Sequence, residues 1–146
     1  MNSKENNILS LIPKAEKYIQ YIIEMIIKIP RTEKYSIGTE YKLSIYKMLE
    51  NIVALNKIEE SKKIGCLNII DTELNLQRIY LRIMYKNGWI NDKKLNVCME
   101  QIYEIGKILG GLIKYYGKNN KKWIWKGLKL WSTYESTYAK QKRKRL

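Results

Sequence analysis

One apolar periodicity constrains the fold of this chain more than any other feature. Between residues 95 and 116, apolar or aromatic side chains recur at steps of three and four: Leu95, Cys98, Ile102, Ile105, Leu109, Leu112 and Tyr116. This spacing places them along one side of an α-helix. The pattern predicts a long helix, capped by Asn91-Asp92, whose apolar side faces a core. Gly110-Gly111 lies inside it, and two adjacent glycines suggest that another backbone approaches closely there, the alternative being that the helix simply tolerates them.

Three earlier segments repeat the pattern and predict three more helices. The first begins with Pro13 in its first turn and stops at Pro30. The second begins near Ser36, and the third runs from Leu67 to Lys86 after a break at Gly65, with Gln77 interrupting its apolar side. Short connections favour an all-α fold, an antiparallel four-helix bundle. We expect residues 1–12 to form a flexible leader, residues 13–117 the bundle, and residues 118–146 a basic tail rich in Trp and Tyr.

The composition argues against an enzyme, a metal site or a cofactor. The chain has no His, and its two cysteines, Cys66 and Cys98, lack metal-ligand spacing. We expect both to be buried free thiols. The nearest acid pairs, Glu59-Glu60 and Asp71 with Glu73, are interpreted as surface groups. Two lone thiols, and the lack of a signal peptide or a long apolar run, indicate a cytoplasmic protein.

The charge points to polyanionic partners. Lys and Arg number 28 against 14 Asp and Glu, a net charge of +14. Residues 1–116 carry 18 bases and 13 acids, whereas residues 117–146 carry ten bases and one acid. Nucleic acid is the first candidate partner, ahead of an anionic membrane surface.

Candidate nucleic-acid-binding residues lie on the predicted third and fourth helices. Arg78 and Arg82 are four residues apart, so their guanidinium groups project side by side and could share a phosphate. The alternative is a solvated face, or salt bridges to Glu100 and Glu104. Further cations complete this set: Lys86, Lys107, Lys114 and Lys118.

The tail interleaves cations with indole rings. Lys121, Lys122, Lys126 and Lys129 alternate with Trp123, Trp125 and Trp131. Such a mixture suits single-stranded nucleic acid, because cations bind the backbone and rings stack on bases. The tryptophans equally suit a protein partner, which we take as their role. Membrane adsorption and packing of the rings back onto the bundle are the alternatives.

Three blocks of the sequence resemble a known family of small four-helix bundles. They are Ile29-Pro30-Arg31-Thr32-Glu33-Lys34-Tyr35-Ser36-Ile37-Gly38, the segment Asp71 to Met84 with its paired arginines, and the segment Glu104 to Lys114 with its two adjacent glycines. The family comprises the accessory variability determinants of diversity-generating retroelements, and it is related to proteins encoded by intervening sequences of 23S ribosomal RNA genes. Gly38-Thr39-Glu40 departs from the more usual Gly-Gln-Arg.

The resemblance implies a function. Its members are non-catalytic homopentamers that bind the retroelement's reverse transcriptase and its template RNA and cDNA, and support error-prone cDNA synthesis. Two alternatives are a four-helix protein of the ribosomal-insert type, whose role is obscure, and a cationic membrane-active protein.

Overall fold

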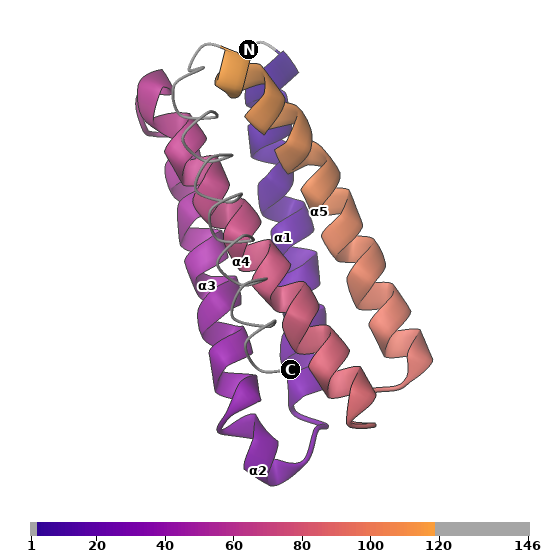
Figure 1. Cartoon of the computed structure of the whole chain (residues 1–146). Coiled ribbons are helices and arrows are strands. Elements are labelled where there is room, and N and C mark those ends of the chain that lie inside the picture. Colours follow the sequence, from indigo (N-terminus) through magenta and orange to yellow (C-terminus); the bar gives the residue numbers. More distant parts are fainter. Residues whose placement is uncertain (1–2, 119–146) are drawn as a thin grey trace, which may run out of the picture.

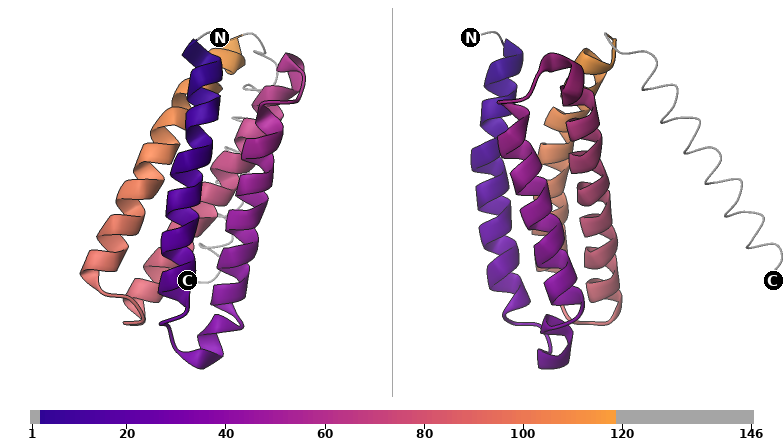
Figure 2. Two further views of the ribbon diagram at one scale, coloured as in Figure 1. Left: turned by 180° about the vertical axis from the view of Figure 1, so that it is seen from behind. Right: turned by 90° about the vertical axis from the view of Figure 1, so that its left-hand side faces the viewer.

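The computed structural model describes residues 3–118, and they form an all-helical bundle (Figure 1). The long helices are α1 (Ser3–Ile26), α3 (Ile37–Leu55), α4 (Glu60–Lys86) and α5 (Asp92–Lys118), and a single turn, α2 (Arg31–Lys34), joins α1 to α3. Contacts run from α1 to α3, α3 to α4, α4 to α5 and α5 back to α1, so each long helix packs on two neighbours (Figure 2). The predicted antiparallel four-helix bundle is confirmed.

The core is built from the predicted apolar periodicities. On α5, Cys98, Ile102, Ile105, Leu109, Leu112 and Tyr116 are all buried, and Leu95 is half-buried. Asn91 begins α5 as predicted, since its Oδ1 accepts a hydrogen bond from the backbone N–H of Lys94 at 2.9 Å. Gly88 ends the α4 region with φ +75°, a conformation that glycine adopts without strain.

The prediction of a flexible leader is wrong for residues 3–12. These residues belong to α1, and Ile8 and Leu11 are buried in the core. Pro13 lies inside the helix instead of in its first turn. Burying two aliphatic side chains contributes about 3–6 kcal/mol. That gain matches or exceeds the roughly 3 kcal/mol that an interior proline costs.

Two glycine predictions also fail. Gly65 does not break the chain but lies within α4, where Ile64 and Leu67 on either side are buried. Gly110 and Gly111 are exposed, and a Cβ on either would meet no described atom within 4 Å. The described residues therefore bring no second backbone to that pair. On α5 it is Gly106 that a neighbouring group approaches closely, namely the Arg78 guanidinium group of α4.

A buried chain of polar side chains crosses the core between α1, α3 and α4. Tyr18 Oη lies 2.7 Å from Tyr41 Oη and donates to Gln77 Oε1 at 2.8 Å. Gln77 Nε2 donates to Ser44 Oγ at 3.1 Å, and Ser44 Oγ donates to Glu73 Oε2 at 2.7 Å. Gln77, the predicted interruption of the apolar side, is thus fully buried and hydrogen-bonded.

The interpretation of Glu73 as a surface group is wrong. Its side chain is buried, and its other oxygen, Oε1, lies 3.3 Å from Lys47 Nζ. A buried carboxylate is costly unless it is paired and hydrogen-bonded. Ser44 and Lys47 supply those partners, so Glu73 closes the network at the surface.

Both cysteines are buried free thiols, as predicted. Cys98 Sγ lies 3.7 Å from Met25 Sδ, and burial raises the pKa of the Cys98 thiol to about 12. Burial also raises the pKa of the Cys66 thiol, although nearby Lys63 opposes that shift. Thiolate is the nucleophilic form, so Cys98 is chemically inert near neutral pH.

Candidate nucleic-acid interface

The predicted cations of α4 begin at the contact with α5, where Arg78 lies, and continue along the exposed side of the helix. Arg82 and Lys86 are exposed, whereas Arg78 is half-buried. Residues four apart on a helix are neighbours, so the three side chains follow one another along α4. The predicted juxtaposition of Arg78 and Arg82 on one side of a helix therefore agrees with the structure.

Arg78 is held by neighbours on α4 and α5. Its Nη1 donates a hydrogen bond to Asn75 Oδ1, and Asn75 Nδ2 lies 3.4 Å from Asp71 Oδ2. A Cβ on Gly106 would lie 3.0 Å from Arg78 Nη2, so the missing side chain leaves room for the guanidinium group. Arg78 is thus a packed, oriented cation at the α4–α5 contact, and not a freely solvated one.

The alternative salt bridges do not occur in the described structure. Among the ion pairs of residues 3–118, neither Arg78 nor Arg82 is paired with Glu100 or Glu104. Glu104 is bound instead by Lys14 on α1, with 3.6 Å between Nζ and Oε2. The guanidinium groups of α4 are therefore not neutralised by those two acids.

The α5 cations form a second line that continues the first toward the opposite end of the bundle, because α5 runs antiparallel to α4 and Gly106 lies level with Arg78. Lys107, Lys114 and Lys118 are exposed and recur at steps of seven and four, so they share one side of α5. Lys107 follows Gly106 directly, and Gly106 touches Arg78. The two lines meet at this point. We call this surface, consisting of Arg78, Arg82, Lys86, Lys107, Lys114 and Lys118, the α4–α5 cationic face.

The predicted tail site lies outside the described residues. This applies to the cations Lys121, Lys122, Lys126 and Lys129 and to the indole rings of Trp123, Trp125 and Trp131.

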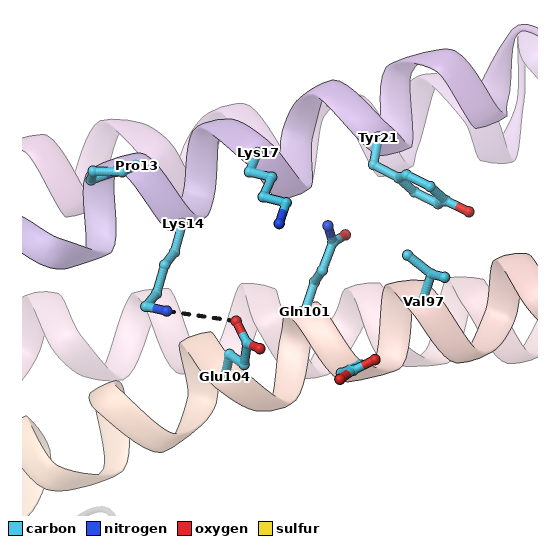
Figure 3. A pocket seen from close by; sticks show the side chains of 8 residues that line it. Pro13, Lys14, Lys17, Tyr21, Val97, Gln101 and Glu104 are labelled. Atoms are coloured by element: carbon cyan, nitrogen blue, oxygen red, sulfur yellow. Dashed lines mark ion pairs between the residues drawn. The ribbon is translucent and has the colours of Figure 1, made fainter.

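A shallow groove between α1 and α5 is a second candidate site (Figure 3). Its volume is about 580 Å³, and it is lined by Pro13, Lys14, Lys17, Tyr21, Val97, Glu100, Gln101 and Glu104. The Lys14–Glu104 ion pair spans it. Gln101 Oε1 is buried there without a hydrogen-bond partner among the described atoms. Its lining contains two carboxylates, Glu100 and Glu104, and no Ser or Cys.

Residues 3–118 contain neither a metal-binding cluster nor a membrane-spanning helix. No group of three or more His, Cys, Asp or Glu side chains in this part of the chain could hold a metal ion. Likewise, none of the helices described here has the length and hydropathy needed to cross a bilayer.

Comparison with known proteins places this geometry in a family. No curated protein matches the chain. A crystal structure of a protein of unknown function from the S23 ribosomal protein family of Bacteroides thetaiotaomicron has the same fold, with a TM-score of 0.67 at 19% identity over 76% of this chain and 98% of that one. The sequence also matches the bAvd-like family over residues 9–116, which span nearly all of the four-helix bundle. The chain therefore belongs to the bAvd-like family, that of the bacterial accessory variability determinants.

Proposed function

We propose that this chain is the non-catalytic accessory subunit of a diversity-generating retroelement. In this role it binds the retroelement's reverse transcriptase together with its template RNA and cDNA, and supports error-prone cDNA synthesis as a homopentamer. The family match over residues 9–116 carries the proposal. A reverse-transcriptase gene beside this one, with a variable repeat mutated at adenines, would support it over a role like that of the ribosomal-insert proteins.

The α4–α5 cationic face is the proposed RNA-binding surface. Six cations lie along two adjacent helices, and the ion pairs of the described residues leave all six without an acidic partner. Two lines of cations on neighbouring helices suit phosphates, because Arg and Lys neutralise them and release bound counterions. Arg78 in addition has a fixed orientation, which favours forked hydrogen bonding to one phosphate.

The experiment compares two triple variants that lose the same charge. In the test variant, Arg82→Gln, Lys107→Gln and Lys114→Gln neutralise exposed positions of the cationic face. In the matched control, Lys17→Gln, Lys28→Gln and Lys57→Gln neutralise exposed positions elsewhere. We expect the test variant to bind template RNA at least about tenfold more weakly than the control, because a loss of about 1.4 kcal/mol is a tenfold change.

The test variant should also reduce cDNA synthesis by the partner enzyme. Equal RNA affinity in the two variants would show that net charge, and not this face, determines binding. Both variants should keep the helical circular dichroism spectrum of the wild type, since all six positions are exposed.

A further inference from the structure

The α4 helix has two apolar sides, and only one of them is used inside the bundle. Its inward side carries Leu67, Ile70, Leu74, Leu81 and Met84, all fully buried. A second set recurs at steps of three, four, three and four on the outward side: Ile69, Thr72, Leu76, Ile79 and Ile83. We call this set the α4 outer stripe. Its three isoleucines are 40–43% exposed.

The neighbouring helix α3 has a shorter stripe of the same kind. Leu43, Tyr46 and Val53 are 57%, 43% and 44% exposed, and Glu50 lies in line with them. The steps of three, four and three place the four residues on one side of the helix. We call this set the α3 outer stripe. In Figures 1 and 2, α3 and α4 are neighbours that pack against each other and diverge toward the Lys86 end of α4, so the two stripes lie on adjacent helices of the bundle.

The other two long helices have polar outward sides. The outward positions of α1 include Glu16, Lys17, Gln20 and Glu24, and those of α5 include Lys107, Gly110, Gly111 and Lys114, with two exposed rings, Tyr103 and Tyr115. Within the described long helices, the large aliphatic side chains that are exposed all lie on α3 and α4. Concentrated apolar surface of this kind marks a site of protein association.

We propose that the α4 outer stripe of one copy of this chain binds the α3 outer stripe of a second copy. This pairing rests on the proposed function in one respect, that copies of the chain associate. It specifies which surfaces of two neighbouring copies are in contact. One contact of this type buries both stripes in every copy. A pairing of α4 with α4, or a foreign helix on α4, would leave the α3 outer stripe in water.

The charges beside the stripes favour the same pairing. Glu50 makes no ion pair within residues 3–118, and neither do Arg82 and Lys86 beside the α4 outer stripe. The contact therefore brings Glu50, the one carboxylate of the α3 outer stripe, to the Arg82 and Lys86 end of the α4–α5 cationic face. A contact between two different surfaces repeats from copy to copy, so it builds a ring if its rotation closes and a filament if it does not.

The test uses the full chain and two stripe variants. Ile79→Glu places a charge in the α4 outer stripe, and Leu43→Glu does the same in the α3 outer stripe. Tyr103→Glu is the control, because it charges an exposed ring on α5. Mass is measured by light scattering and sedimentation velocity. We expect the wild type and Tyr103→Glu to be oligomeric and both stripe variants to be monomeric, all with the same helical circular dichroism spectrum.

The decisive sample is a mixture of the two stripe variants. The Ile79→Glu chain keeps an intact α3 outer stripe and the Leu43→Glu chain keeps an intact α4 outer stripe. The intact α4 outer stripe of one chain can bind the intact α3 outer stripe of the other. The two altered stripes cannot bind, so no third chain can be added. We expect the mixture, at high concentration, to give a one-to-one dimer and nothing larger. Ile83→Gln replaces Ile79→Glu if the new carboxylate disturbs folding.

Several outcomes would overturn the pairing. A monomeric wild type would do so, as would stripe variants with the mass of the wild type, or a mixture that remains monomeric. Template-RNA binding by the wild type is measured in the same samples. Wild-type chain that self-associates as described but binds no RNA would count against the proposed function and leave the pairing intact.

Discussion

At the residue scale, the buried polar chain around Gln77 specifies how three helices align. Each hydroxyl or amide N–H donates in one direction, from Tyr41 through Tyr18 to Gln77, and from Gln77 through Ser44 to Glu73. A shift of α4 against α1 or α3 would leave buried polar atoms unpaired, at about 1–3 kcal/mol each. Apolar periodicity alone tolerates such shifts more easily, since one aliphatic side chain can replace another in a core.

The order of donors predicts unequal effects for two conservative changes. Tyr18 lies in the middle of the chain, so Tyr18→Phe removes two hydrogen bonds and leaves Gln77 Oε1 and the Tyr41 hydroxyl without their partner. We expect a loss of about 2–4 kcal/mol in the free energy of unfolding, against about 1 kcal/mol for Tyr41→Phe at the end of the chain. Urea denaturation of the two variants measures both values. The reverse order would contradict the central position of Tyr18 in this chain of hydrogen bonds.

The buried Cys98 thiol predicts a loss of stability in alkali. Its pKa is about 12 in the folded protein against an ordinary value of 9.0, because burial disfavours the thiolate. Between these two values the unfolded chain loses the proton and the folded chain keeps it. The contribution of Cys98 to stability is therefore complete below pH 9 and disappears as the pH rises toward 12.

Unfolding by urea at increasing pH tests this linkage. Burial raises the pKa of Tyr18 and Tyr41 as well, so the wild type should become steadily less stable above pH 9. Cys98→Ala should be less stable than the wild type near neutral pH, because it leaves a small cavity, yet its stability should fall less steeply with pH. Parallel pH curves for the two proteins would contradict the assignment to Cys98.

At the scale of the elements, the sequence predicts which helices exist better than where they start. The cap at Asn91 was confirmed, because a capping side chain acts on its own helix turn, whereas the first helix ends at Ile26, four residues before the predicted stop at Pro30. The start of α1 and the continuity of α4 through Gly65 were missed. In both cases the local penalty of a Pro or Gly is outweighed by core contacts, and those depend on helices distant in the sequence.

Part of the cationic face was also predictable, and part was not. The step of four grouped Arg78 with Arg82 on one side of a helix, as the structure has them. The contact between Arg78 and Gly106 depends on the register of α4 against α5, which no spacing within either helix reveals. The half-buried state of Arg78 follows from that register. Single truncation of Arg78 is thus a less clean test of binding than changes at Arg82 or Lys107.

Three glycines in the helices should respond to alanine in opposite ways. A Cβ at Gly110 or Gly111 would meet no described atom, so Gly110→Ala and Gly111→Ala should each stabilise the chain by up to about 1 kcal/mol through helix propensity. At Gly38, a Cβ would lie 3.1 Å from Ile26 Cγ2 and 3.2 Å from the Glu33 carbonyl oxygen, so Gly38→Ala should destabilise it. Thermal melts at low protein concentration rank the three variants. Destabilisation by Gly110→Ala would reveal a neighbour that covers this part of α5.

At the scale of the whole molecule, the charge is divided between the bundle and the tail. Residues 3–118 carry 19 basic and 13 acidic side chains, a net charge of +6, and residues 119–146 carry nine basic side chains and one acidic. In the bundle, six of the 19 basic side chains form the α4–α5 cationic face, and two acids, Glu73 and Glu104, are paired with lysines of other helices. Nucleic-acid affinity should therefore draw on both parts of the chain.

Salt dependence can separate the two contributions. For single-stranded nucleic acid, the logarithm of the binding constant falls with the logarithm of salt concentration by about 0.7 for each phosphate neutralised. Neutralising Lys121, Lys122, Lys126 and Lys129 with glutamine should reduce this slope by up to about 3. The triple variant of Arg82, Lys107 and Lys114 should reduce it by up to about 2. Titrations of labelled template RNA at several salt concentrations give both slopes.

The two reductions in slope should add when the variants are combined, because each of the seven basic side chains neutralises its own phosphate of the RNA. An unchanged slope in the tail variant, with a reduced slope in the triple variant, would confine RNA binding to the bundle. The opposite result would place it in the tail and leave the α4–α5 cationic face for another polyanion or for an acidic surface of the polymerase. A slope near zero in the wild type would contradict phosphate neutralisation as the basis of binding, since counterion release is unavoidable when Lys and Arg bind a polyanion.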